Sequence, residues 1–347
     1  MKSKNLSEKI LRSVKSKGFK YIELPSVIEA NHIVQRSGEN FRKFMFSFTD
    51  INGKELCLRP DLTIASCLRY LEGNFKGKEK IFYSGQAYRK VESKKDKIIR
   101  NQVGFEILGS KDEKNDDKEI INTSIKILQD FKFSSGTLTI GNIEIFNLLI
   151  SKLDIPKRWK LRLSRHFWRE EYFNDLLKRL ETNADIDPTI VEIDKKRYLD
   201  LLNKNPETMI AGRSVGEILK RFDTKIKDPR QAKRGNKVSK IIKSFLKINC
   251  PINKASMELN KFFKKNKINL VVDQRYFPIS SNKLSKLNVK FSTSFGRHLE
   301  YYSGMVFKID VKSKSTTIKC AGGRYNRLIS DLGSKKQVPA VGAAFNL

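Results

Sequence analysis

Hydrophobic and polar positions alternate regularly in the run Arg297–Phe307 (RHLEYYSGMVF), and this pattern predicts a β-strand. Tyr302, Gly304 and Val306 are expected on one face and the intervening residues on the other. A glycine two positions from a tyrosine leaves a hollow beside a phenol, which makes room for a ligand. Taken alone, the run is explained more simply as a core strand with a packing glycine. The ligand interpretation therefore depends on whether other strands share this feature.

The run Ile81–Arg89 (IFYSGQAYR) also alternates and places Gly85, Ala87 and Arg89 on one face. An arginine beside two of the smallest residues suits anion binding, because its guanidinium can clamp a carboxylate or a phosphate with two parallel hydrogen bonds. This strand therefore predicts an anion clamp.

The run Gln102–Ile107 is the most informative strand. Its odd-numbered residues are apolar and are expected to face the core, whereas Gln102, Gly104 and Glu106 share the other face. A glutamate two positions from a glycine, on a strand whose other face is apolar, is expected to accept a hydrogen bond from a ring N–H or to hold a protonated imidazole.

If these three strands are neighbours in one antiparallel sheet, their small-residue faces form one continuous pocket. That pocket combines an anion clamp, a carboxylate for a ring and an aromatic wall. The pattern indicates a site for an amino acid with a polar ring.

A further strand, Glu55–Pro60, leads into a helix with apolar residues from Ile64 to Leu71. Asp61 is well placed to cap this helix, and we weigh that structural role equally with a ligand role. Together, Asp61 and Thr63 are able to accept hydrogen bonds from an ammonium group.

Elsewhere the pattern predicts a helix over residues 5–16 that ends at Gly18, and short strands over Tyr21–Leu24 and Asn269–Asp273. Residues 155–265 alternate helical stretches and charged loops with several prolines. We interpret that region as a helical insertion.

Composition changes this picture little. The chain has 347 residues with 70 Lys+Arg against 38 Asp+Glu, a formal net charge of +32, and 39% hydrophobic residues. Such a charge raises the possibility of nucleic-acid binding. However, the lysines are scattered along the whole chain, with no arginine-rich arm. A solvated lysine coat is therefore the preferred explanation, and nucleic-acid binding is not expected.

The four cysteines form no C-x-x-C pair and are predicted to be reduced residues of a cytoplasmic protein. The three histidines are too isolated to suggest a metal site. The N-terminus has no apolar signal core, and no apolar run approaches the length of a membrane span.

Five runs, taken in order, resemble the catalytic domain of histidyl-tRNA synthetases: ELCLRPDLT, IFYSGQAYR, NQVGFEILG, RHLEYYSGMVF and AGGRYNRL. The resemblance covers roughly residues 1–150 and 290–347. It implies an α+β fold of the class II aminoacyl-tRNA synthetase type, an antiparallel sheet flanked by helices. Residues 1–347 would be one such domain, interrupted by the helical insertion at about 155–265 and without an anticodon-binding domain.

Within this group the chain is most similar to the paralogous family of regulatory subunits of ATP phosphoribosyltransferase. The sequence stops at Leu347, before the helix in which the synthetases carry an ATP-packing arginine, and it has Asp61 where they have glutamate. This resemblance implies a non-catalytic subunit, without cofactor or metal, that serves the first step of histidine biosynthesis. Its expected partners are the separate catalytic chain in a hetero-oligomer, a second copy of itself, and histidine as a feedback effector.

The resemblance also implies a histidine-binding set consisting of Asp61, Thr63, Arg89, Gln102, Glu106, Arg297, Tyr302 and Tyr325. The first two would face the α-amino group and the arginine at 89 the carboxylate. Gln102 and Glu106 would hold the amino group and the imidazole, and the last three would close the pocket. His298 replaces a glycine usual in the family and makes the aim of Arg297 uncertain, while Arg100 and Asn101 replace an aromatic-rich pair on the ATP side.

Two other functions stay open on the sequence alone. One is a shortened synthetase-like enzyme that activates histidine with ATP, which the missing arginine argues against. The other is a tRNA- or RNA-binding module that uses the positive charge, for which affinity would fall steeply with salt.

Overall fold

The structure is a computed structural model that describes residues 2–37, 39–73, 77–91, 97–131, 135–182, 188–210, 212–226, 232–281, 283–284, 286–297, 301–312 and 317–347. The chain forms two compact units. The first comprises Met1–Ile145, Asn249–Leu259 and Val272–Leu347, and the second comprises Phe146–Ile248 and Asn260–Val271.

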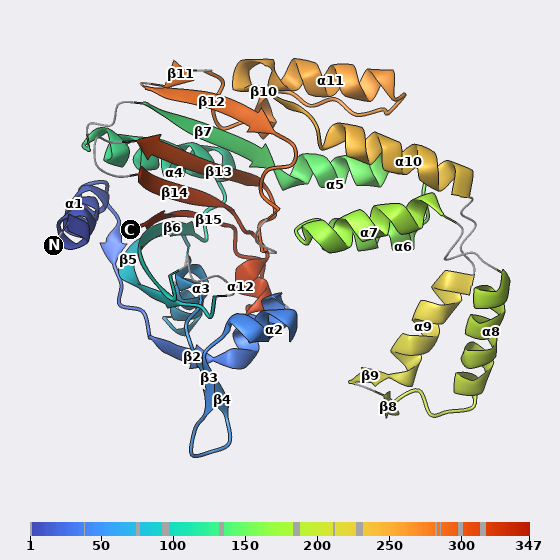
Figure 1. The fold of residues 1–347 in the computed structure, drawn as a ribbon. Helices are drawn as coiled ribbons and strands as arrows, with labels where there is room; N and C mark the ends of the chain where they lie inside the picture. The colour runs from blue at the N-terminus through green and yellow to red at the C-terminus, as the bar shows by residue number, and fades with distance from the viewer. Residues whose placement is uncertain are drawn as a thin grey trace. The chain divides into compact units, whose positions relative to one another are not determined.

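A mixed β-sheet is the centre of the first unit (Figure 1). Within the described residues it has ten strands in the order β1-β5-β6-β15-β14-β13-β7-β12-β10, with β11 paired to β12. The strand bounds are β1 Lys20–Tyr21, β5 Glu79–Tyr88, β6 Ile99–Leu108, β15 Ala340–Asn346, β14 Thr317–Arg324, β13 Met305–Lys312, β7 Ser135–Asn142, β12 Leu287–Ser292, β10 Asn249–Pro251 and β11 Lys283–Leu284. All neighbours are antiparallel except the parallel pairs β1–β5 and β7–β12. The predicted α+β class is confirmed. Of the three strands that we considered as neighbours, β5 and β6 pair antiparallel, whereas β15 and β14 separate β13 from β6.

Helices cover both faces of this sheet. The helices of the first unit are α1 Lys2–Lys15, α2 Ala30–Ser37, α3 Leu62–Glu72, α4 Glu113–Gln129, α12 Leu328–Asp331 and the 3₁₀ helices η1 Glu39–Phe44, η2 Ile252–Lys254 and η3 Gln274–Tyr276. Phe105 of β6 packs its ring against Phe19, which follows α1, whereas its neighbour Glu106 faces Thr63 of α3. Because adjacent residues of a strand point to opposite faces, α1 and α3 lie on opposite sides of the sheet. α4 lies on the α1 side, where it contacts β6, β13, β14 and β15.

The predicted N-terminal helix is confirmed and begins earlier than expected. Ile10 and Val14 are fully buried, as the apolar periodicity requires. The helix is followed by Gly18 at φ +80°, a conformation that favours glycine. The strand expected over Tyr21–Leu24 is shorter and shifted, because only β1 pairs with β5.

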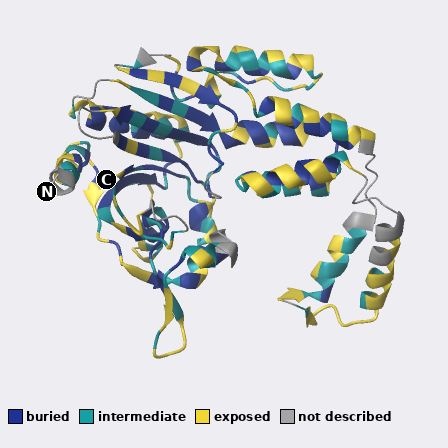
Figure 2. Ribbon diagram, viewed as in Figure 1, coloured by how far each residue is buried: buried dark blue, intermediate teal, exposed yellow. Residues whose placement is uncertain are grey.

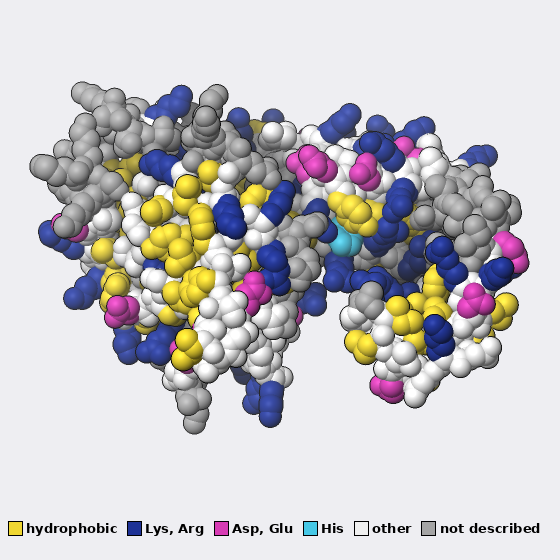
Figure 3. Space-filling model, turned by 60° about the horizontal axis from the view of Figure 1, so that its bottom comes forward, with side chains coloured by type: hydrophobic (Ala, Val, Ile, Leu, Met, Phe, Trp, Pro, Cys, Tyr) yellow, Lys and Arg dark blue, Asp and Glu magenta, His cyan; other side chains and the backbone are white. Residues whose placement is uncertain are grey.

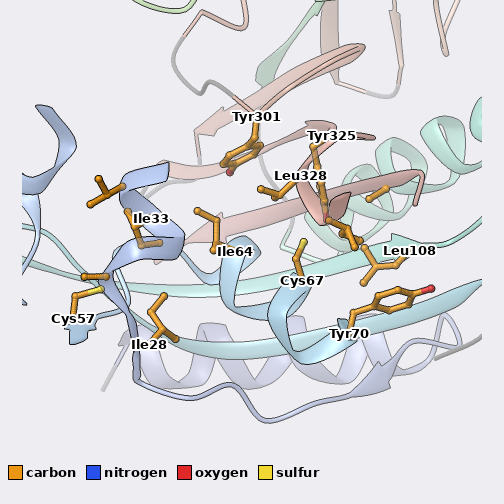
Figure 4. Close-up of a cluster of buried hydrophobic side chains, with 14 of the residues drawn as sticks. Ile28, Ile33, Cys57, Ile64, Cys67, Tyr70, Leu108, Tyr301, Tyr325 and Leu328 are labelled. Atoms are coloured by element: carbon orange, nitrogen blue, oxygen red, sulfur yellow. The ribbon is translucent and has the colours of Figure 1, made fainter. Parts of the chain in front are cut away.

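A small sheet has the strand order β2 (Val27–Glu29), β4 (Glu55–Leu58) and β3 (Ser47–Thr49). It adjoins a hydrophobic cluster to which α3 and the C-terminal part of the chain both contribute buried side chains. Figure 4 shows Tyr301, Tyr325 and Leu328 together with Ile64 and Cys67 of α3 in this cluster. The cluster therefore joins segments far apart in the sequence and supports the α3 face of the large sheet.

Arg59 connects the N-terminal segment to β5. Its Nη1 donates to the carbonyls of Leu24 and Pro25, and its Nε donates to the carbonyl of Gln86. A Cβ at Gly85 would lie 2.3 Å from Nη2 of Arg59. The hollow at Gly85, which we expected to open toward a ligand, is therefore filled by an arginine of the chain itself.

The second unit is helical, with α6 Lys157–Arg165, α7 Glu170–Glu181, α8 Pro188–Leu202, α9 Val215–Ile226, α10 Ala232–Phe245, parts of α5 (Ile143–Lys152) and α11 (Ala255–Lys265), and the short strands β8 (Met209–Ile210) and β9 (Arg213–Ser214). Its core is aromatic, because Phe146 contacts the rings of Phe167, Phe173 and Phe245. Figure 2 shows buried residues along α6, α7 and α10, while the side chains of α8 and α9 whose burial is described are mostly intermediate or exposed. The one-domain reading with an insertion at about 155–265 stays a prediction.

Two predicted strands are wrong in part or in whole. The strand expected over Arg297–Phe307 begins only at Met305. Residues 301–304, which precede it, have no regular secondary structure. The strand expected over Asn269–Asp273 is irregular as well, although Val271 is 73% exposed and Val272 fully buried. Alternating burial reports on which side chains face the interior, and it does not require a hydrogen-bonded neighbour.

Lys and Arg side chains are spread over the face drawn in Figure 3, with hydrophobic and acidic side chains between them. The four cysteines are free thiols. Among the described helices, none has both the length and the apolar character needed to cross a bilayer.

We predict that Arg59→Met lowers the free energy of unfolding by about 3 kcal/mol, because the change leaves the buried carbonyl of Leu24 and two partly buried carbonyls without their donor. Urea denaturation followed by circular dichroism measures this. Arg69→Met is the matched control, since Arg69 pairs with Glu72 at the surface with 51% of its side chain exposed, and it should change stability by less than about 0.5 kcal/mol. An equal, small effect of both variants would contradict the role given to Arg59.

Candidate ligand-binding site

A cavity of about 180 Å³ lies in the first unit on the α3 side of the sheet. It is lined by Pro60, Asp61, Thr63, Ala87, Arg89, Arg100, Gln102, Glu106, Tyr301, Tyr302, Ala321, Gly322, Tyr325, Gly342, Ala343, Ala344 and Asn346. Seven of the eight predicted site residues are in this set. Their assignment to histidine stays a prediction.

Glycines seat the side chains of the cavity wall. A Cβ at Gly342 would lie 1.2 Å from Oε2 of Glu106, its partner in the β15–β6 register. A Cβ at Gly104 would lie 2.4 Å from the ring of Tyr83. The hollow at Gly104 was expected to admit the ligand, and instead a protein side chain fills it; the sequence reasoning did not single out Gly342.

A protein side chain also lies against Gly323, the second glycine of the AGGRYNRL run. A Cβ at Gly323 would lie 2.9 Å from the ring of Tyr302. The open floor of the cavity is lined instead by small residues of β5, β14 and β15, among them Ala87, Ala321 and Ala344. The glycines therefore make room for the large side chains of the cavity wall, and the small alanine side chains leave the volume of the cavity open.

Glu106 is the centre of the site. The side chain is 1% exposed. Its Oε1 accepts hydrogen bonds from Tyr83 at 2.5 Å and from Thr63 at 3.3 Å, and its Oε2 accepts from Tyr325 at 2.6 Å. Burial raises the pKa of Glu106 to about 7, against the lowering effect of the hydrogen bonds from both phenols. A cation or a ring N–H placed beside this carboxylate would favour its ionised form.

Two tyrosines of the site were missed by the sequence reasoning. Tyr83 lies in β5 two positions before Gly85, which is the same tyrosine–glycine spacing that drew attention to Tyr302. Tyr301 lines the cavity beside Tyr302, and its hydroxyl is 3.4 Å from Oδ2 of Asp61. We expected Tyr301 and Tyr302 on opposite strand faces, but neither residue belongs to a strand.

Asp61 divides its two oxygens between structure and site. Its Oδ1 accepts from the backbone N–H of Ile64 at 3.0 Å, so the predicted helix cap is confirmed. Its Oδ2 is 3.7 Å from Nη2 of Arg89. The ligand role that we weighed equally with capping stays a prediction, and the geometry allows both roles at once.

Arg89 is held from behind. Its Nε donates to the carbonyl of Pro60 at 2.8 Å, and its guanidinium lies 5.6 Å from the ring centroid of Phe41. A guanidinium anchored in this way at the cavity wall suits an anionic group.

The polar rim of the cavity includes Arg100, which the sequence reasoning noted only as a departure. Gln102 donates from Nε2 to Oδ1 of Asn346 at 2.7 Å. Arg100 and Asn346 line the same cavity. Asn346 was missed by the sequence reasoning, because its strand β15 is far from β6 in the sequence and lies beside it only in the fold.

Arg297 is the predicted site residue that is not among the cavity-lining residues of the described chain. The side chain is 6% exposed, and the residue follows Gly296, whose φ is +99°. The chain therefore turns at this point and does not run as the predicted strand. His298, which we expected to affect the aim of Arg297, lies outside the described residues.

Metal binding has no candidate in the described part of the chain, where no three His, Cys, Asp or Glu side chains gather as a metal site would require. The cavity instead offers hydrogen-bond acceptors, two guanidinium groups and phenols. This set suits a small organic molecule with both an anionic and a cationic or ring N–H group.

Several known proteins resemble this chain. A family model described as Histidyl-tRNA synthetase matches residues 1–347. A protein named ATP phosphoribosyltransferase regulatory subunit, from Agrobacterium fabrum, is 27% identical over 338 residues, which cover 92% of this chain and 89% of that protein.

Solved structures share the fold. A protein described as an ATP phosphoribosyltransferase regulatory subunit/histidyl-tRNA synthetase from Bacillus halodurans has 21% identity and a TM-score of 0.57, and the match covers 99% of this chain and 76% of that one. A chain of the ATP phosphoribosyl transferase (HisG:HisZ) complex from Thermotoga maritima has 18% identity and a TM-score of 0.53, over 99% and 96% of the two chains. The resemblance predicted from five short runs is confirmed, and the chain belongs to the histidyl-tRNA synthetase family.

Proposed function

We propose that this chain is a non-catalytic regulatory subunit of ATP phosphoribosyltransferase that binds histidine in the cavity described above. Its resemblance to a relative of that name extends over nearly the full length of both chains. The observation that carries the histidine assignment is the buried Glu106 between two phenols, at the bottom of a cavity that also presents Arg89 and Asp61.

Histidine fits this arrangement group by group. The imidazole N–H donates to Glu106, whose carboxylate is already oriented by Tyr83 and Tyr325. The carboxylate of the ligand pairs with Arg89. The α-amino group is held by acceptors of the rim and wall, which are Asp61, Thr63 and Gln102. Tyr302 closes the cavity over the ligand, whereas Arg297 lies outside the lining and is not assigned a contact with it.

The partner is a separate catalytic chain, by analogy with the Thermotoga maritima complex. Feedback requires histidine to bind the inhibited assembly more tightly than the active one, by about 1–3 kcal/mol. A ligand that bound both states equally would shift nothing. We also expect a self-dimer and a cytoplasmic location.

The competing function is activation of histidine by ATP, because the matching family model bears the name of the synthetase. Against it, the ATP side departs from the synthetase pattern at Arg100 and Asn101. The regulatory proposal requires that the chain has neither this activity nor phosphoribosyltransferase activity of its own.

We predict that Glu106→Gln weakens histidine binding by at least about 100-fold, because a neutral amide cannot pair with an imidazolium and points an N–H₂ group at a phenol. Isothermal titration calorimetry measures this. Glu119→Gln is the matched control and should leave the affinity unchanged, since Glu119 lies on α4, outside the cavity lining, and pairs with Lys80 of β5. Absence of histidine heat in the wild-type protein would refute the proposed ligand.

We predict that Glu106 makes the unliganded protein less stable as the pH rises. Its pKa is raised from 4.5 to about 7 in the folded state, so the folded protein holds a proton that the unfolded chain has already released. The contribution is full below about pH 4.5 and is lost as the pH rises through about 7, with a size of about 3 kcal/mol.

Urea unfolding of the wild type and of Glu106→Gln from pH 5 to pH 8 measures this difference. Because the variant cannot titrate at position 106, the wild type should lose stability relative to it across this range. A difference that did not change with pH would show that Glu106 has an ordinary pKa.

We predict that the purified chain exchanges no pyrophosphate into ATP in the presence of histidine and forms no phosphoribosyl-ATP alone. Adding the catalytic chain should restore phosphoribosyl transfer, and histidine should then inhibit it. A clear histidine-dependent exchange rate would favour the synthetase-like alternative.

A further inference from the structure

Two short segments meet at the edge of the cavity, just beyond the ends of β13 and β14. The backbone N–H of Ser303 donates to the carbonyl of Arg324 at 2.8 Å, and the backbone N–H of Asn326 donates to Oγ of Ser303 at 3.0 Å. The side-chain oxygen Oδ1 of Asn326 also accepts a hydrogen bond from the backbone N–H of Ala340 at 3.2 Å. Residues 302–304 and 324–326 are therefore held together as one hydrogen-bonded piece of backbone.

On the α3 side, this piece carries two tyrosines of the site. Tyr302 lies over Gly323, and the hydroxyl of Tyr325 donates to Glu106. Tyr325 is 1% exposed. On the side away from the cavity its ring packs in the hydrophobic cluster of α3, so a ligand that pushes the ring away from the cavity displaces the backbone that carries it.

On the α4 side, the same piece carries Arg324, which is 4% exposed. Its Nε donates to Oδ1 of Asp117 at 2.8 Å, and its Nη2 donates to the backbone carbonyl of Glu113 at 2.8 Å. Asn326 donates from Nδ2 to both carboxylate oxygens of Glu113, at 3.1 and 3.0 Å. The first two turns of α4 are thus fixed to residues 324 and 326.

A second cavity, of about 750 Å³, lies beside these contacts. Arg324, Asp117 and Glu113 line it together with Gly304 and Tyr276. Gly304 lies against the stem of Arg324, where a Cβ would be 3.3 Å from Cδ. The wall of this second cavity is therefore made by the backbone piece that also makes the wall of the first.

We propose that Arg324 and Asn326 are positioning residues that couple the ligand cavity on one side of the sheet to the N-terminal turns of α4 and the second cavity on the other side. A buried ion pair has few alternative arrangements, so a shift of Tyr325 moves the start of α4 or breaks the Arg324–Asp117 contact. The regulatory meaning of this coupling rests on the proposed function, since it gives histidine occupancy a route to a distant surface. The physical coupling itself requires neither histidine nor a partner chain.

The structure contains a matched control. Tyr83 donates to Oε1 of Glu106 just as Tyr325 donates to Oε2, and both rings are fully buried. Tyr83 lies within β5, which pairs with β6, and it is not part of the backbone piece that holds α4. Losing either hydroxyl removes the same kind of hydrogen bond, but only one of them belongs to the proposed route.

The experiment is a pair of double-mutant cycles on the unliganded full chain, measured by urea unfolding. One cycle combines Tyr325→Phe with Asp117→Asn, and the other combines Tyr83→Phe with Asp117→Asn. In the first, we expect the change in the unfolding equilibrium constant to be smaller than the product of the single changes by about fivefold or more. In the second, the single changes should multiply within about twofold.

Equal coupling in both cycles, or no coupling in either, would overturn the proposal. If Asp117→Asn does not fold, Ser303→Ala replaces it in both cycles, because it removes the acceptor of the Asn326 N–H with little change in shape. Because no histidine is present, a failure of these cycles is distinct from a failure of the proposed function, which is read from the histidine titration.

Discussion

The structure of the site depends on the burial of one carboxylate. Glu106 lines the cavity with almost no exposed surface, and in the described part of the chain it accepts hydrogen bonds from three hydroxyl groups. Burying an ionised carboxylate is costly unless hydrogen bonds replace its water. Here hydrogen bonds from two phenols and a threonine reduce that cost without removing it. The pKa of Glu106 is raised because part of the cost of burying its charge remains. A positively charged or N–H-donating ligand beside Glu106 would reduce this remaining cost.

The sheet makes this arrangement possible through register. The strand pairings bring Tyr83 opposite Gly104 and Glu106 opposite Gly342, so each large side chain lies beside a residue with no side chain. The α3 side of the sheet is closed by the cluster that includes Ile64, Cys67 and Tyr325. Glu106 and Tyr83 are therefore held by strands of the main sheet and Tyr325 by the core cluster, whereas Tyr301 and Tyr302 lie in the irregular segment 301–304.

Much of this was predictable from the chain. The period-two patterns placed Glu106, Gln102 and Arg89 on small-residue faces, and those side chains do line one cavity. What the pattern could not show was which atoms would fill the hollows. A glycine reports that something approaches closely, but whether that is a ligand or Tyr83 depends on strand pairing over long sequence distances. The irregular path of residues 301–304 was missed because the two tyrosines favour a strand, whereas Ser303 and Gly304, which favour a turn, were taken as positions of that strand.

The close approach at Gly342 has an evolutionary consequence. Even a methyl group there would occupy the position of the Glu106 carboxylate, since the two centres would be 1.2 Å apart. Positions 106 and 342 are thus not free to drift separately: a lineage that gave up the acid could fill the vacated space with a larger residue at 342, and a lineage that kept the acid could not. Among distant descendants of this fold, the identity of residue 342 should therefore reveal whether the ability to hold a ring has been retained.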